Sequence, residues 1–335
     1  MFVTLISLMA TAATQGSGLQ PELRAFLSGE MKFSPSDLAD LQAGKIVAHG
    51  LGASAPGEIA AVGAVRVHAG RDAFVHQYRD IVRFKRGPEV LQIGRFSHPP
   101  TLDDLAALTL SKEDVDMRTC RVGHCDIRLP AATIARFQRE IDWMARDADA
   151  RAAALFKQVL LDHVGAYLTG GPGQIFAYDD EKRAVHPVDD FAGLLQNSPY
   201  IGRLVPGLPD HLRDVREPLA GAEDFLYWSK EKFGFTPFVT VTQVTILPAT
   251  PTSTVIASKD VYSSRYFDAS LTLTIASDGV GVAGNDFYLV YMNKSRASAL
   301  KGSFSSLRRA IVERRVKSSL DENLRLVKSR LEDKP

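Results

Sequence analysis

Residues 238–247 read FVTVTQVTIL, and they open the stretch that decides the fold. A second run covers 254–275, beginning TVIASKDVY, and a third, DFYLVYMN, covers 286–293. β-branched and aromatic residues dominate these runs and turn residues bound them, as is typical of half-buried strands. The sequence therefore predicts three long strands, with 254–275 as one continuous strand.

A long helix is predicted after these strands, from about 305 to 332. Apolar residues recur there every three or four positions in one stripe: Val312, Val316, Leu320, Leu324, Val327 and Leu331. Such a stripe is typical of a helix packed on a sheet. Basic residues flank it: Arg308, Arg309, Arg314, Arg315, Lys317, Arg325 and Lys328. They leave a second interpretation open, peripheral contact with an anionic membrane surface.

Shorter elements precede this stretch. Two helices are expected between 19 and 44, the second capped by Ser34 or Ser36. Strands are predicted at 45–49, 58–68 and 89–96, and an amphipathic helix at 71–84. The section that follows is expected to be mostly helical, with helices at 102–108, 131–168 (broken near Asp147), 189–195 and 222–233, a short strand at 174–178 and an irregular connector at 199–218.

This order of elements resembles the START-like (SRPBCC, helix-grip) superfamily. The resemblance covers 58–96 and 236–332, and it implies an α+β fold in which a curved antiparallel sheet grips a long C-terminal helix around an apolar cavity. Residues 97–235 would then be a large, mainly helical insertion in a START-like domain at 56–335, preceded by an N-terminal helical segment at 19–55. The segments CRVGHCD (120–126), YWSK (227–230) and YSSRYF (262–267) are also similar to an uncharacterised bacterial family of predicted secreted proteins.

The resemblance implies binding or carriage of a lipid or other hydrophobic small molecule between the sheet and the C-terminal helix. It carries over no catalytic residue. Polar groups on the inward face of a strand could orient a ligand head group. The candidates for ligand binding are Tyr262, Arg265, Tyr266, Asp268 and Tyr288. Strand alternation would place Tyr262, Tyr266 and Asp268 on one face, although an outward polar face would have the same pattern.

Two other functions stay open at this point. One is a hydrolase- or lyase-type enzyme that uses the same cavity, because a fold alone does not exclude catalysis. The other is a non-catalytic interaction protein whose sheet is solidly packed. A cavity with convergent titratable groups would favour the enzyme, and an apolar cavity with one polar end would favour the carrier.

The composition and charge of the chain restrict the classes of partner that it is expected to bind. The chain has 335 residues, 45% of them hydrophobic and 24% charged, as in a globular protein that buries a substantial core. Its formal net charge of +1 indicates no nucleic-acid partner. No cofactor and no stable protein partner are indicated by any motif.

The first residues resemble a secretory signal peptide. An apolar run at 2–10 is followed by small residues at 11–13, although no Lys or Arg precedes the run. We therefore expect a signal peptide at 1–18 and a periplasmic or secreted protein. A buried helix or strand is the alternative for this segment.

Cys120 and Cys125 form the tightest chemical cluster, with His124 between them. A disulfide, a pair of inert thiols, and a metal or redox role all stay open. A zinc site usually needs four ligands, and no second Cys/His pair stands at a suitable spacing, so no metal site is predicted.

Overall fold

The computed structural model describes residues 18–112, 114–232, 236–281, 286–301 and 305–333. Its centre is an eight-stranded sheet in the order β1-β2-β8-β7-β6-β5-β4-β3, antiparallel throughout. The strands are β1 (Val47–Leu51), β2 (Glu58–Val67), β3 (Val90–Arg95), β4 (Glu223–Glu231), β5 (Phe238–Thr250), β6 (Ser253–Ser263), β7 (Ala269–Asp278) and β8 (Phe287–Arg296). The predicted α+β fold, a curved antiparallel sheet with a long C-terminal helix, is confirmed.

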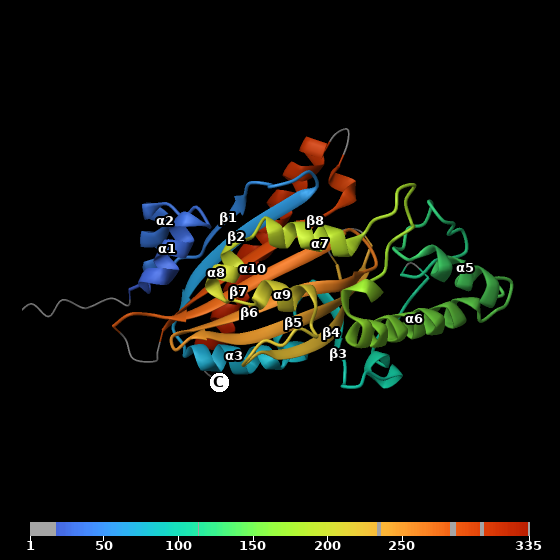
Figure 1. The fold of residues 1–335 in the computed structure, drawn as a ribbon, viewed down its shortest axis with the longest axis horizontal. Helices are drawn as coiled ribbons and strands as arrows, with labels where there is room; N and C mark the ends of the chain where they lie inside the picture. Colours follow the sequence, from blue (N-terminus) through green and yellow to red (C-terminus); the bar gives the residue numbers. More distant parts are fainter. Residues whose placement is uncertain (1–17, 113, 233–235, 282–285, 302–304, 334–335) are drawn as a thin grey trace, which may run out of the picture.

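Helices cover both faces of the sheet and one of its ends (Figure 1). They are α1 (Pro21–Gly29), α2 (Pro35–Gln42), α3 (Arg71–Arg79), α4 (Ile81–Phe84), α5 (Ala131–Glu140), α6 (Ala148–Gly170), α7 (Pro187–Gln196), α8 (Tyr200–Leu204), α9 (Leu208–Arg213) and α10 (Ser305–Glu332). α3, α4 and α10 pack on one face, and α1, α2, α7, α8 and α9 pack on the other. α5 and α6 lie beside the end of β4, β5 and β6.

The C-terminal helix α10 docks through its apolar stripe, as predicted. Leu320 and Leu324 are buried against the face of the sheet that includes Val65 and Leu289. Gly63 on β2 permits this close approach, because a Cβ there would lie 2.7 Å from Leu324 Cδ1. None of the described helices is long and apolar enough to cross a membrane.

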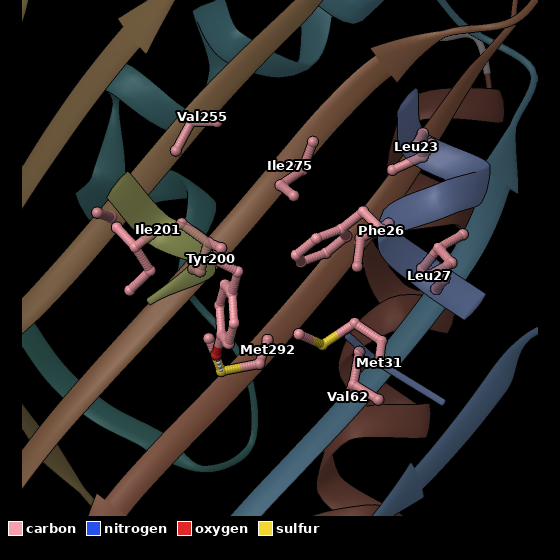
Figure 2. Close-up of a cluster of buried hydrophobic side chains, with 14 of the residues drawn as sticks. Leu23, Phe26, Leu27, Met31, Val62, Tyr200, Ile201, Val255, Ile275 and Met292 are labelled. Atoms are coloured by element: carbon pink, nitrogen blue, oxygen red, sulfur yellow. Dashed lines mark hydrogen bonds between the residues drawn. The ribbon is translucent and has the colours of Figure 1, made fainter. Parts of the chain in front are cut away.

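The opposite face has a core of its own (Figure 2). Phe26 of α1 and Tyr200 of α8 meet edge to face, with ring centroids 5.7 Å apart. The Tyr200 hydroxyl donates to Met292 Sδ on β8 at 3.7 Å. Ser34 caps α2 as predicted, because its Oγ accepts the Asp37 amide at 3.1 Å.

The helix predicted at 222–233 is wrong, because Glu223–Glu231 forms strand β4. Six consecutive residues of β4 are buried. Tyr227 points into the core under α10, whereas Trp228 packs in the cluster that contains α6. A strand buried on both faces lacks the alternation that marks a half-buried strand. The helical section between β3 and β4 therefore ends before Glu223; that it is an insertion into a START-like domain stays a prediction.

The continuous strand predicted at 254–275 is also wrong, because β6 ends at Ser263 and β7 runs back antiparallel to it from Ala269. Tyr266 adopts a left-handed φ of 67° in the turn. Ser263 Oγ donates to the Arg265 carbonyl at 2.7 Å, a local bond that serine favours in turns. The turn thus forms without glycine or proline.

Smaller elements differ from prediction where a local break was missed. The helix predicted at 71–84 is split at Asp80, whose side chain caps α4 by accepting from the Arg83 amide. The helix at 102–108 is a single 3₁₀ turn, and the strand predicted at 174–178 is replaced by the end of a 3₁₀ turn (Gly171–Gln174) and an isolated bridge at Tyr178. The connector at 199–218 contains α8 and α9. The predicted signal peptide, apart from Gly18, lies outside the described residues.

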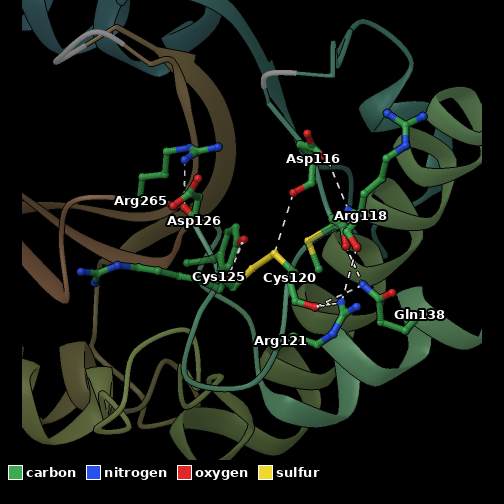
Figure 3. Close-up of a disulfide and its surroundings, with 11 residues drawn as sticks. Asp116, Arg118, Cys120, Arg121, Cys125, Asp126, Gln138 and Arg265 are labelled. Atoms are coloured by element: carbon green, nitrogen blue, oxygen red, sulfur yellow. Dashed lines mark hydrogen bonds between the residues drawn. A yellow bond between two sulfur atoms is a disulfide. The ribbon is translucent and has the colours of Figure 1, made fainter. Parts of the chain in front are cut away.

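Cys120 and Cys125 are joined by a disulfide (Figure 3). Gly123 turns the loop between them with a φ of 77°. The Cys120 carbonyl accepts from Gln138 Nε2 at 3.3 Å, which attaches the loop to α5. Disulfides persist in oxidising compartments, and secretion of this protein stays a prediction. Among the described residues, no group of three His, Cys, Asp or Glu side chains is placed to hold a metal ion.

Candidate functional site

A cavity of about 340 Å³ lies between the sheet and α10. That volume is within the range of small-molecule sites. Its apolar and aromatic walls come from α3, α4, α10, the first residue of β5 and the β6–β7 turn. The residues are Phe74, Tyr78, Phe84, Phe238, Phe267, Val316, Leu320, Leu324 and Val327.

The mouth of the cavity is marked by the lining residues that are exposed to solvent. They are Arg86, Pro88, Glu322, Asn323 and Arg330. The mouth therefore lies between α10 and the connection from α4 to β3. Arg330 NH1 donates to the Phe84 carbonyl at 2.6 Å, which ties the end of α10 to this connection.

The sheet side of the cavity is mostly polar, although Ile59, Ala61 and Leu289 also line it. Two rows of cross-strand neighbours line it, Tyr227–Thr242–Asp260 over β4 to β6 and Ser258–Thr272–Asn293 over β6 to β8. Asn293 Nδ2 donates to Thr272 Oγ1 at 3.1 Å. Hydroxyl and amide groups thus occupy positions that the core of a packed sheet would fill with apolar side chains.

A charged pair stands at the β4 side of this floor. Lys85 Nζ donates to Glu231 Oε1 and to the Tyr227 hydroxyl, at 3.0 Å each. Burial by itself would lower the pKa of Lys85, but the charge of Glu231 raises it well above its ordinary value. Burial would raise the pKa of Glu231, and the charge of Lys85 brings it below its ordinary value. Both groups are therefore charged at neutral pH, and their charges cancel.

Asp260 differs from this pair because none of the described cations forms an ion pair with it. Thr242 Oγ1 donates to Asp260 Oδ1 at 2.9 Å. Burial raises the pKa of Asp260 to about 7; the Thr242 hydrogen bond and the charge of Lys85 oppose the rise, and the charge of Glu231 adds to it. Within the described part of the chain, no Lys, Arg or His side chain forms an ion pair with this carboxylate. It is thus half ionised near neutral pH.

The predicted ligand-binding residues lie outside the lining of this cavity. Three of them hold the segment that leads into α5. The Tyr262 hydroxyl donates to the Arg128 carbonyl at 3.1 Å, and Arg128 NH1 donates to Asp268 Oδ1 at 2.6 Å. Arg265 NH1 donates to the Asp126 carbonyl at 2.9 Å (Figure 3). These contacts join the β6–β7 turn to the helices at the end of the sheet.

The other two predicted residues are separate from these three. The Tyr266 hydroxyl donates to the Thr236 carbonyl at 2.9 Å, and its ring meets Phe238 edge to face. Tyr288 on β8 is buried in the core under α1 and α2, on the face opposite the cavity. The face that alternation predicted for Tyr262, Tyr266 and Asp268 does not exist, because the chain turns between them.

The cavity residues did carry a sequence signal. Thr240 and Thr242 alternate with Val239 and Val241 along β5, a pattern that usually indicates a face in water, and Ser258 and Asp260 are spaced by two on β6 with Lys259 between them. Here the same face is covered by α10, so the polar residues line a cavity. Alternation alone does not distinguish these two arrangements.

No protein-family model matches this chain, and no curated protein matches it. Among solved structures, the chain is similar to the Zhui aromatase/cyclase from Streptomyces sp. R1128. The likeness covers 44% of this chain and 90% of that chain, with 14% sequence identity and a TM-score of 0.25. The architecture of the chain is α+β: the helix α10 covers one face of a curved antiparallel sheet, and a cavity lies between them.

Proposed function

We propose that the protein binds a small amphipathic organic molecule in the cavity between α10 and the sheet. The observation that carries this proposal is a cavity of about 340 Å³ with aromatic and aliphatic walls and a floor of hydroxyl, amide and carboxyl groups. Apolar walls gain free energy by desolvating a ligand, at about 25 cal/mol per Å² of apolar area buried. The polar floor would orient the ligand. A molecule of one to three rings suits the volume better than a two-chain lipid.

Blocking the mouth tests this proposal. The neutral fluorescent dye N-phenyl-1-naphthylamine is expected to bind the full-length protein. Replacing Asn323, an exposed residue at the mouth, by tryptophan is expected to weaken dye binding at least tenfold. Arg325→Trp is the matched control, because Arg325 is exposed on the same helix and does not line the cavity; its affinity should stay within about twofold of the wild type.

Two outcomes would contradict the proposal. One is equal dye binding by the Asn323→Trp variant and the wild type, which would place the dye elsewhere. The other is a wild-type protein that binds no dye and that, by native mass spectrometry after purification from its host, holds no organic molecule.

A second candidate function is proton transfer to or from the bound molecule. The observation that favours it is the convergence of Asp260 with Tyr227 and the Lys85–Glu231 pair around one cavity. A carboxyl whose pKa is about 7 is suited to general acid–base catalysis at neutral pH. The test is incubation in D₂O of the wild type with the molecule extracted from it. Deuterium at carbon that requires Asp260 and is lost in Asp260→Asn would support catalysis, and its absence from the wild type would exclude this form of it.

A further inference from the structure

The charges around the cavity do not balance. Lys85 and Glu231 form an ion pair at 3.0 Å, so the second carboxylate, Asp260, adds a negative charge without a counter-charge when it ionises. An uncompensated carboxylate in a desolvated site is costly, and a bound cation removes that cost. From this imbalance we infer that the molecule bound in the cavity carries a protonated amine that pairs with Asp260. The inference rests on the proposed binding function and names the class of its ligand.

The surroundings of Asp260 fit an organic ammonium group. Thr242 occupies Oδ1, and Asp260 is one of the residues whose surface forms the cavity. The aromatic rings of Tyr78, Tyr227 and Tyr291 line the same space, and ring faces attract cations. A metal ion fits less well, since hard cations take six or more oxygen ligands and the described residues hold no group of three candidate ligands.

Other charged groups around the cavity do not supply this counter-charge. Lys85 is taken up by Glu231 and by the Tyr227 hydroxyl. Arg86 and Arg330 are exposed at the mouth, where water screens their charges, and two further carboxylates, Glu89 and Glu322, line the same cavity. Among the described residues, Lys85 is the cation whose charge acts on Asp260, and it is already paired with Glu231, so a cation that pairs with Asp260 would come from the ligand.

Protonation of Asp260 makes the inference testable by pH. Its pKa of about 7 means that the carboxyl is almost fully neutral at pH 5.5 and mostly ionised at pH 8. An alkylamine stays protonated at both values. Affinity for an amine should therefore rise by about tenfold or more from pH 5.5 to pH 8, whereas affinity for a neutral analogue should not change.

The experiment compares 2-naphthylmethylamine with its neutral isostere 2-naphthylmethanol by isothermal titration calorimetry on the full-length protein. At pH 8 the wild type is expected to bind the amine at least about tenfold more tightly than the alcohol, the value of a charged hydrogen bond. In Asp260→Asn the two probes should bind equally at both pH values. Asp72→Asn, which removes a carboxylate that is 91% exposed on α3 and does not line the cavity, is the matched control and should keep the amine preference within about twofold.

The outcomes separate this inference from the proposed function. Equal affinity of the wild type for both probes, or a preference that survives Asp260→Asn, would overturn the amine assignment and leave the cavity as a binding site. Failure to bind either probe would also overturn it if N-phenyl-1-naphthylamine still binds. Failure to bind all three molecules would overturn both proposals.

Discussion

Replacing Arg128 by methionine is expected to lower the free energy of unfolding by about 3–5 kcal/mol at pH 8, the usual cost of breaking a buried ion pair from one side. Arg128 NH1 lies 2.6 Å from Asp268 Oδ1, and their side chains are 6% and 0% exposed. Arg128 NH2 also donates to Ser298 Oγ at 3.3 Å. Methionine keeps the aliphatic part of the side chain but leaves the Asp268 carboxylate buried, with the Ser298 hydroxyl 3.0 Å away and with Lys301, 3.8 Å away and 44% exposed, as the nearest cation among the described residues.

The loss of unfolding free energy in the Arg128→Met variant should depend on pH. Burial raises the pKa of Asp268, and the charge of Arg128 opposes that rise. Without Arg128 the pKa of Asp268 rises further, so the folded variant binds a proton more tightly than the unfolded chain does. A group with a raised folded-state pKa loses stability as pH rises through that pKa. The Arg128→Met deficit is therefore expected to be larger at pH 8 than at pH 5.

Urea unfolding of two further variants completes this test. Asp268→Asn added to Arg128→Met should recover part of the lost stability, because it removes the unpaired charge. Arg136→Met should cost no more than about 0.5 kcal/mol, since Arg136 forms an exposed pair with Glu140 on α5. A deficit below about 1 kcal/mol at pH 8, or one that is the same at pH 5, would show that this ion pair does not hold the segment before α5 to the sheet.

The pairing of Asp268 with Arg128 could not be predicted from the sequence. Asp268 was assigned to a strand and to ligand binding, because a polar residue among strand residues fits a cavity floor. Its partner Arg128 is 140 positions away, and no local pattern links them. The β6–β7 turn depends on such partners, since the Arg128 amide also donates to the Ser264 carbonyl at 3.0 Å. Tertiary contacts of this kind are invisible to periodicity.

Whether an element was predicted correctly depended on how many of its faces are buried. The helix predicted at 305–332 matches α10, because one of its faces is in water and its apolar stripe is distinct. β4 was mistaken for a helix because both of its faces are covered. The position of the cavity followed from the resemblance, whereas its lining did not. Lys85 and Asp260, which define its charge, lie on different elements, and their convergence requires the three-dimensional fold.

The second large effect is expected at the contact that closes the cavity. Leu324 is 3% exposed and packs over Gly63 of β2, and it also lines the cavity. Leu324→Ala removes buried atoms at a site that already borders an empty volume, so the neighbouring residues have little reason to collapse into the gap. We expect the free energy of unfolding to fall by about 2–4 kcal/mol.

Ile311→Ala is the matched control for this variant, because Ile311 lies on the same helix but is 61% exposed. It should change stability by no more than about 0.5 kcal/mol. Urea unfolding of the two variants would contradict the docking of α10 if both lost the same amount. Dye binding adds a second measurement, since Leu320 and Leu324 hold α10 on the sheet and also form the wall of the cavity. The double variant Leu320→Ala/Leu324→Ala should therefore lose affinity for N-phenyl-1-naphthylamine even under conditions in which the sheet remains folded. Retained affinity there would mean that closure of the cavity does not depend on the stripe that docks the helix.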